Sequence, residues 1–404
     1  MTVQIEFAPD RRSEWKRGWL VVAASTVGIG TGAGLAQYTS SLFVEPLQAA
    51  FGWTRGEIGT IGAFGLLGAL SAPLIGRLAD RFGARRVATI CILAATLAYL
   101  GLSVMQGRLW QFAACSLLLG AAAPGCTGLV YSRAVVGWFE RDRGLALGII
   151  ASGLPVATLL ITPLLAAVIR DHGVQSGYLV LAGAASLIGL PLVLLGVRDA
   201  PRAPLADDHV AGPLGAIIRS RTFWLLALIL FLVNMPATGV LTQLAPLLTS
   251  KGASAAQAAT AVGVFAAFML FGRIGVGWLF DRLDARRVAA AVTGLSAAAC
   301  IILFANSGLS LLVFAAVMMI GLLQGAETDV LGYFVGRHFD HDAFGFVYGA
   351  LFTISLMGTA IGIMAFGHLF DLSGNYDLAL IIAMIILVVV ATLYLLIPRE
   401  RQIR

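Results

Sequence analysis

Long apolar runs alternate with short polar segments along the whole chain. A helix rises 1.5 Å per residue, so about twenty apolar residues cross the roughly 30 Å hydrocarbon core of a bilayer. We therefore expect an all-α membrane protein. Runs of sufficient length predict twelve transmembrane helices, at approximately 18–43, 56–76, 86–105, 109–132, 144–169, 175–197, 222–249, 256–280, 287–306, 309–336, 344–370 and 377–397.

The polar turns between the runs repeat two hundred residues further on. Residues 76–86 read GRLADRFGARR and residues 277–287 read GWLFDRLDARR. A second pair of turns, 138–142 and 338–342, keeps the same spacing. Repetition at this scale is typical of membrane carriers built from two parallel halves. The sequence thus predicts two pseudo-symmetric six-helix bundles, joined by a polar linker. The predicted units are residues 1–197, the linker 198–221 and residues 222–404.

Composition and charge place these helices in a membrane and orient them. Apolar residues make up 59% of the chain and charged residues 12%, and the mean hydropathy is +0.91. This balance excludes an ordinary soluble domain. Of the 27 basic residues, 22 fall in the termini and the even-numbered connections, which share one face of the predicted topology. Because Lys and Arg stay on the cytoplasmic side, we expect a multi-pass protein of the inner (plasma) membrane with both termini cytoplasmic. The first apolar run is too long for a signal peptide, so we expect it to be retained.

The same analysis argues against several other classes of protein. The net charge of +6 follows from the topology rather than from nucleic-acid binding. The four cysteines all lie within predicted spans and lack metal-ligand spacing. The sequence has no nucleophile, metal or nucleotide constellation. We therefore expect no enzyme activity, no cofactor and no metal site.

Arg273 is a basic residue inside a predicted span. An arginine at the centre of a membrane helix costs about 2.5–3.5 kcal/mol on insertion scales, so it normally faces a cavity or a partner. Its guanidinium matches a carboxylate in bidentate geometry, so we expect it to bind an anionic substrate. The alternative is a fixed ion pair with Glu327 or Asp329. These two carboxylates are two residues apart and point to different sides of a helix, so at most one of them is expected to carry a proton.

The turn at residues 76–86 resembles the loop signature of the major facilitator superfamily, with a degenerate copy at residues 277–287. The resemblance implies the major facilitator fold along the whole chain and a gating role for the turns. Asp80 would pair with arginines of its own loop and hold one state closed; alternatively, the turns only determine topology. The gating residues expected on this basis are Gly76, Asp80, Arg81, Arg85, Asp281, Arg282, Arg141 and Arg143.

A narrower resemblance is found in residues 138–148, WFERDRGLALG, followed by Ser152-Gly153. This pattern is similar to a signature of monocarboxylate transporters and oxalate:formate antiporters. Gln37-Tyr38 resembles the substrate-facing pair of the antiporters, and residues 325–329, GAETD, resemble bacterial members of the group.

The chain also departs from that group. Met269 stands where animal monocarboxylate transporters have an aspartate, and Gln37 stands where they have a lysine. The second cation of the antiporters has no counterpart at residues 351–355. One buried cation suits one carboxylate better than two.

We expect an alternating-access secondary transporter of small organic anions, above all monocarboxylates, working as a monomer in the lipid bilayer. Transport would use proton symport or carboxylate exchange. The alternatives are an efflux permease for drugs or metabolites, disfavoured because residues 148–155 lack the Gly-Pro-x-x-Gly-Gly run of drug antiporters, and a carrier-derived membrane sensor. The expected substrate-binding residues are Arg273, Gln37, Tyr38, Tyr131, Tyr348 and Ser355, and the candidates for proton coupling are Glu327 and Asp329.

Overall fold

The computed structural model describes residues 11–139, 142–199, 219–280, 282–306, 310–339 and 344–398. Within these ranges the chain forms helices and no strands. Eleven of the helical segments are long and apolar enough to cross a membrane. The first predicted span is the twelfth segment, and it is divided into helices of 21, 6 and 11 residues. The prediction of an all-α membrane protein with two six-helix bundles is confirmed.

The amino-terminal bundle consists largely of interrupted helices. Only its third segment, α6 (Ala84–Ser103), is one continuous α-helix. The sixth segment contains a π-helical turn, η3, between its two α-helices. The interrupted segments are α1 (Arg11–Thr31), α2 (Gly34–Thr39) and α3 (Ser41–Phe51); α4 (Arg55–Gly68), η1 (Ala69–Ser71) and α5 (Ala72–Phe82); α7 (Leu109–Ala122), η2 (Ala123–Cys126) and α8 (Gly128–Val136); α9 (Arg143–Ala151) and α10 (Gly153–His172); and α11 (Val174–Gly183), η3 (Ala184–Gly189) and α12 (Leu190–Gly196).

The carboxyl-terminal bundle differs in this respect, because each of its six segments is one uninterrupted α-helix over the residues described. Side-chain caps fix several of the starts: the hydroxyls of Ser220 and Ser310 accept from the N–H groups of Phe223 and Val313. The helices are α14 (Arg221–Ser250), α15 (Ala255–Phe280), α16 (Ala285–Ala305), α17 (Leu311–His338), α18 (Phe344–Ser373) and α19 (Asp377–Leu396).

The prediction of one continuous helix over residues 18–43 is wrong in detail. The helix stops after Thr31 and again at Ser40. Glycine is a poor helix former, and the run Gly28-x-Gly30-x-Gly32-x-Gly34 weakens the helix here. The buried Tyr99 hydroxyl on α6 donates to the Gly32 carbonyl at 3.1 Å, which supplies a partner at the break. The short helix α2 that follows carries Gln37 and Tyr38.

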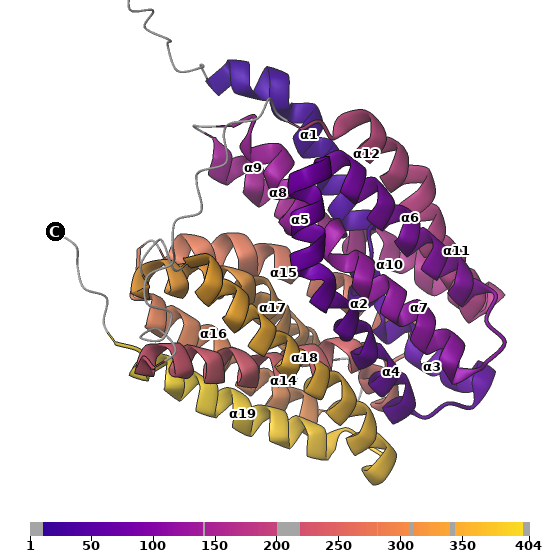
Figure 1. Ribbon diagram of the computed structural model, residues 1–404. Helices are drawn as coiled ribbons and strands as arrows, with labels where there is room; N and C mark the ends of the chain where they lie inside the picture. The colour runs from indigo at the N-terminus through magenta and orange to yellow at the C-terminus, as the bar shows by residue number, and fades with distance from the viewer. Residues whose placement is uncertain are drawn as a thin grey trace, which may run out of the picture.

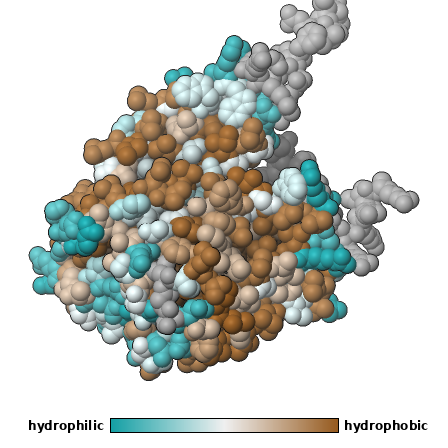
Figure 2. Space-filling model, turned by 180° about the vertical axis from the view of Figure 1, so that it is seen from behind, coloured by the Kyte–Doolittle hydropathy of each residue, from teal (hydrophilic) through white to brown (hydrophobic). Residues whose placement is uncertain are grey.

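The two bundles lie side by side, and both described chain ends are at one face of the molecule (Figure 1). We call this the terminal face, and the end that carries Arg55 and Tyr376 the opposite face. Hydrophobic residues cover most of one side of the molecule, with hydrophilic residues gathered towards its ends (Figure 2). Exposed side chains such as Leu160, Leu187 and Ile274 are suited to lipid rather than water.

Glycines let helix backbones approach closely at both kinds of interface. Within the carboxyl-terminal bundle, a Cβ on Gly358 or Gly362 of α18 would lie 2.1 Å from a backbone carbonyl oxygen of α14. Between the bundles, a Cβ on Gly59 of α4 would lie 2.7 Å from the Ile363 carbonyl of α18. Small residues are the usual means of helix packing in membranes. The helix pairs α4–α18 and α10–α15 join the two bundles.

Candidate substrate site and the contacts around it

A cluster of polar side chains occupies the middle of the molecule, where the two bundles meet. Tyr38 of α2 comes from the amino-terminal bundle, and its hydroxyl lies beside the Gln324 amide of α17. Arg273 of α15 and Glu327 of α17 are both within electrostatic range of that hydroxyl. Three residues expected from the sequence to bind substrate or protons therefore share one site, although they are up to 289 residues apart.

Arg273 reaches from one bundle to the other. Its Nη1 donates to the backbone carbonyl oxygen of Ala151, the last residue of α9, at 2.8 Å. The side chain is half-buried and lies in a helix that is otherwise apolar. A guanidinium has five N–H donors in a planar fork. It can therefore present donors both to the opposite bundle and to an anion between the bundles.

Glu327 is tied into the carboxyl-terminal bundle. Gln324 Nε2 donates to Glu327 Oε2 at 3.1 Å, and Asn234 of α14, whose Nδ2 donates to the Leu230 carbonyl oxygen at 2.9 Å, lies near this carboxylate. Asn234 Oδ1 in turn accepts from the Thr359 hydroxyl of α18 at 3.1 Å. Glu327 also lines a small cavity inside the bundle, together with Thr293 and Tyr394. This carboxylate is therefore within electrostatic range of Arg273 and Tyr38 and also borders the bundle interior.

The remaining predicted substrate residues lie in different surroundings. Gln37 is half-buried, next to Tyr38 on α2. Tyr131 has no exposed surface and packs against Gly28 and Val193 inside the amino-terminal bundle. Tyr131 is thus enclosed within the amino-terminal bundle, and its role in substrate binding stays a prediction.

Three predicted site residues remain: two substrate-binding candidates on α18 and one proton-coupling candidate on α17. Tyr348 stacks on Phe352 near the start of α18, with ring centroids 6.4 Å apart. Ser355 is buried and donates to the Phe352 carbonyl oxygen of its own helix at 2.9 Å, as isolated serines in membrane helices commonly do. Asp329 belongs to α17, but its side chain lies outside the part of the structure described here.

The predicted gating residues that the structure describes lie at the terminal face. The Gly76 carbonyl oxygen accepts from Arg133 Nη1 at 3.3 Å. Arg81 lies over the Phe82 ring and Arg282 over the Trp278 ring, at 5.3 and 4.1 Å from the centroids. Arg85 and Arg143 are exposed near helix starts. Asp281 and Arg141 are outside the described residues, as is the Asp80 side chain.

Two aspartates that the sequence analysis did not single out hold the duplicated turns. Asp199, after the sixth segment, accepts from the Ala84 N–H at the start of α6, at 2.6 Å. Asp284 caps α16 by accepting from the Arg286 N–H at 3.1 Å, and Arg286 Nη1 donates to the Ile397 carbonyl oxygen at 3.0 Å. The hydrogen bond from the Arg286 guanidinium lowers the pKa of the Asp284 carboxyl. Each turn is thus tied to the last segment of its own bundle.

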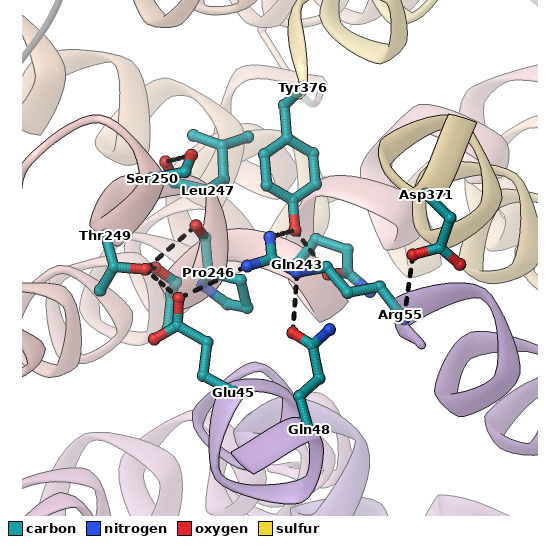
Figure 3. A network of polar contacts seen from close by, with 11 residues as sticks. Glu45, Gln48, Arg55, Gln243, Pro246, Leu247, Thr249, Ser250, Asp371 and Tyr376 are labelled. Atoms are coloured by element: carbon teal, nitrogen blue, oxygen red, sulfur yellow. Dashed lines mark hydrogen bonds and ion pairs between the residues drawn. The ribbon is translucent and has the colours of Figure 1, made fainter. Parts of the chain in front are cut away.

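A polar network at the opposite face joins the bundles a second time (Figure 3). Its centre is Arg55, the first residue of α4, which is 7% exposed. The guanidinium donates to the Tyr376 hydroxyl, and that hydroxyl donates to Gln243 Oε1 at 2.8 Å. Burial raises the pKa of the Tyr376 hydroxyl above its usual value, so this group keeps its proton and remains a donor.

Sequence reasoning missed Gln324 and the network around Arg55 for different reasons. Gln324 precedes Glu327 by three positions, the spacing of one helix face, so this signal was available. Arg55 and Tyr376 are 321 residues apart. No pattern in the sequence indicates that they meet.

A molecule with two six-helix membrane bundles and a polar site between them belongs to the class of membrane transporters. The model of the Major Facilitator Superfamily matches residues 21–287 and 244–404. The chain belongs to this superfamily. The predicted family and the expectation that the protein is a transporter rather than an enzyme are confirmed.

Similar proteins within the superfamily are named for different kinds of transport. Monocarboxylate transporter 13 of Bos taurus is 26% identical over 393 residues, which cover 91% of this chain and 86% of that protein. A gallate transporter of Pseudomonas putida is 28% identical, over 73% of this chain and 74% of its own. An MFS-type efflux pump of Mycolicibacterium smegmatis is 28% identical, over 67% and 64%.

The fold also matches solved structures. A bacterial homologue of the human lysosomal transporter Spinster superposes with a TM-score of 0.71 over 96% of this chain and 97% of that chain. The sequences are 17% identical, so this likeness concerns the fold.

Proposed function

We propose that the protein carries small monocarboxylates across the plasma membrane, by proton symport or by exchange for another carboxylate. The terminal face, where most basic residues fall, is cytoplasmic in this proposal. The site lies between the units 1–197 and 222–404, and one chain is sufficient to form it.

The observation that carries the proposal is the position of Arg273. This cation comes from one bundle, donates a hydrogen bond to the other bundle at Ala151, and lies within electrostatic range of Tyr38. A backbone carbonyl is a neutral acceptor, whereas a carboxylate would form shorter and stronger charge-assisted bonds with the same donors. An anion at this position would therefore bind both bundles through Arg273 and Tyr38. Two relatives named as transporters of a monocarboxylate or of gallate, itself a carboxylate, agree with this substrate class.

Glu327 is the proton carrier in the symport version of the proposal. It shares the site with Arg273 but accepts a hydrogen bond from the neutral amide of Gln324, with the Asn234 amide nearby. A carboxylate so placed feels burial, which favours its protonated form, and the nearby cation, which favours its ionised form. An anion bound to Arg273 would weaken the stabilisation of ionised Glu327 by this cation, and would therefore favour proton uptake by Glu327.

The test is uptake of radiolabelled lactate, pyruvate, formate, oxalate and gallate into proteoliposomes, with and without an imposed pH gradient or internal carboxylate. Arg273→Ala should reduce uptake at least about a hundredfold, since a charge-assisted bidentate contact is lost in a dry site. The matched control is Arg287→Ala, because the Arg287 side chain is 74% exposed at the terminal face. Glu327→Gln should abolish stimulation by the pH gradient while exchange persists.

Other results would redirect the assignment. Carboxylate uptake that does not change in Arg273→Ala excludes this site. Exchange without any effect of the pH gradient in the wild type selects the antiport version. An efflux function is the second candidate, because one relative is named an efflux pump; it predicts no carboxylate uptake and export of a hydrophobic drug from loaded vesicles. Binding without turnover would identify a sensor.

A further inference from the structure

The charged and neutral partners of Arg55 lie in different bundles, and this division affects how the transporter opens. Arg55 Nε donates to Gln48 Oε1 at 2.9 Å, and Arg55 Nη2 lies 3.6 Å from Glu45 Oε1. Both partners belong to α3 of the same bundle. These contacts satisfy and neutralise the cation within the amino-terminal bundle, whatever the other bundle does.

A second group of contacts crosses to the carboxyl-terminal bundle. Arg55 Nη1 donates to the Tyr376 hydroxyl, and the guanidinium carbon lies 3.7 Å from the centre of the Phe370 ring. The Thr249 hydroxyl of α14 donates to Glu45. In Figure 3 the guanidinium lies between Glu45 and Gln48 on one side and Tyr376 on the other. The crossing partners of the guanidinium are neutral.

The start of α4 is capped from the other bundle as well. Asp371 at the end of α18 accepts from the backbone N–H groups of Arg55 and Gly56, at 3.1 and 2.6 Å. A carboxylate at a helix N-terminus is stabilised by the helix dipole and by these donors. Glycines permit this approach, because a Cβ on Gly56 would lie 2.5 Å from Asp371 and one on Gly367 would lie 2.4 Å from the Arg55 carbonyl oxygen.

The helix also has a cap of its own. The Thr54 hydroxyl accepts from the Glu57 N–H at 3.1 Å, and Glu57 Oε2 accepts from the Thr54 N–H at 2.9 Å. This capping box lies wholly within the amino-terminal bundle. If the bundles separate here, the capping box therefore still stabilises the N-terminus of α4. At this N-terminus, the N–H groups that donated to Asp371 then donate to water instead.

We infer that Arg55, with Tyr376 and Asp371, forms a latch that holds the opposite face closed and is built to release. Leaving a buried charge unpaired is strongly unfavourable, and the latch avoids this because Glu45 moves with Arg55. Opening exchanges hydrogen bonds to Tyr376 and Asp371 for hydrogen bonds to water. The latch thus sets the balance between the closed and open states of this face, independently of which substrate is carried.

Pulsed EPR tests the latch without any substrate. Spin labels on Gln106→Cys and Leu372→Cys, both exposed at the opposite face, report the separation of the two bundles there. Protein without the introduced cysteines accounts for labelling of the four native ones. Tyr376→Phe removes one crossing hydroxyl and Asp371→Asn removes the capping charge. Each should raise the ratio of long to short distances on the order of tenfold, the equilibrium effect of one charge-assisted hydrogen bond.

The matched controls remove the same groups from contacts within one bundle. Asp377 is six residues from Asp371 and pairs with Lys251 of its own bundle at 3.6 Å, and Tyr178 is buried against Phe43 in the amino-terminal bundle. Asp377→Asn and Tyr178→Phe should leave the distance distribution unchanged. If Tyr376→Phe and Asp371→Asn resemble the wild type, or if the controls shift it equally, the latch is refuted. Failure of carboxylate uptake would leave this result intact, so the two proposals fail separately.

Discussion

Arg55 and Arg273 are both arginines inside an apolar molecule, yet their surroundings differ. Arg55 has an acidic partner in its own bundle and neutral partners across the interface. One contact of Arg273 across the interface is with a backbone carbonyl oxygen, in a site that also holds an acidic residue and a tyrosine hydroxyl. The first environment suits a structural contact that must break and re-form. The second suits a cation that exchanges a weak acceptor for a stronger, anionic one.

Asp284 permits a prediction about acid stability. Its pKa is lowered in the folded protein by Arg286, so its contribution is full above the unfolded pKa of about 3.9 and is lost as the pH falls through the lower folded value. Asp284→Asn should therefore lower the melting temperature in detergent at pH 7 by a few degrees. The difference from wild type should shrink as the pH falls below the unfolded value and disappear once the pH is below the lower folded pKa. A difference that persists at that pH would show that the charge is not responsible.

At the scale of elements, the sequence predicted spans better than it predicted their interruptions. Each span needs a long apolar run because the bilayer core offers no hydrogen bonds. Such runs can be recognised directly in the amino-acid sequence. The break after Thr31 follows glycines that equally indicate close packing, and its partner Tyr99 is 67 residues away. The candidate site shows the same division. Charges such as Arg273 stand out in an apolar run, whereas the partners of Arg55 depend on how the bundles dock.

The close contact between α14 and α18 gives a second prediction. Gly→Ala normally stabilises a helix interior by about 0.5–1 kcal/mol, and Gly349→Ala on α18 should do so because nothing lies within 4 Å of the added Cβ. Gly362→Ala on the same helix should destabilise instead, since its Cβ would lie 2.1 Å from the Met235 carbonyl oxygen. Thermal unfolding of the two variants should therefore change in opposite directions. Equal effects would contradict the backbone contact.

At the scale of the whole molecule, the asymmetric distribution of basic residues and the two sets of inter-bundle contacts together indicate which side of the site is closed. The candidate site lies between the terminal face and the latch at the opposite face. If the terminal face is cytoplasmic, the latch closes the external side. While the latch is formed, the site would then be closed to the external side and could exchange only with the cytoplasm.

This orientation can be measured directly on intact cells. Gln106→Cys is exposed at the opposite face, and Arg85→Cys would be exposed at the terminal face. A membrane-impermeant maleimide should label the first in intact cells and the second only after permeabilisation. The native protein serves as the control for its four cysteines, of which three are buried. The reverse pattern would invert the topology inferred from charge.

The six carboxyl-terminal helices are continuous, whereas most helices of the other bundle are interrupted. This difference affects how easily the helices of each bundle bend. A hydrogen-bond ladder without breaks resists bending, whereas breaks and π-helical turns are where helices bend. Arg273, Gln324 and Glu327 lie on α15 and α17, whose sequences contain no proline, whereas Asn234 lies on α14, which has Pro236 and Pro246 inside it. Tyr38 is mounted on a six-residue helix between two breaks. We therefore expect α15 and α17 to hold Arg273, Gln324 and Glu327 in a constant arrangement. Adjustment to substrates of different size would then come mainly from the interrupted helices that carry Tyr38.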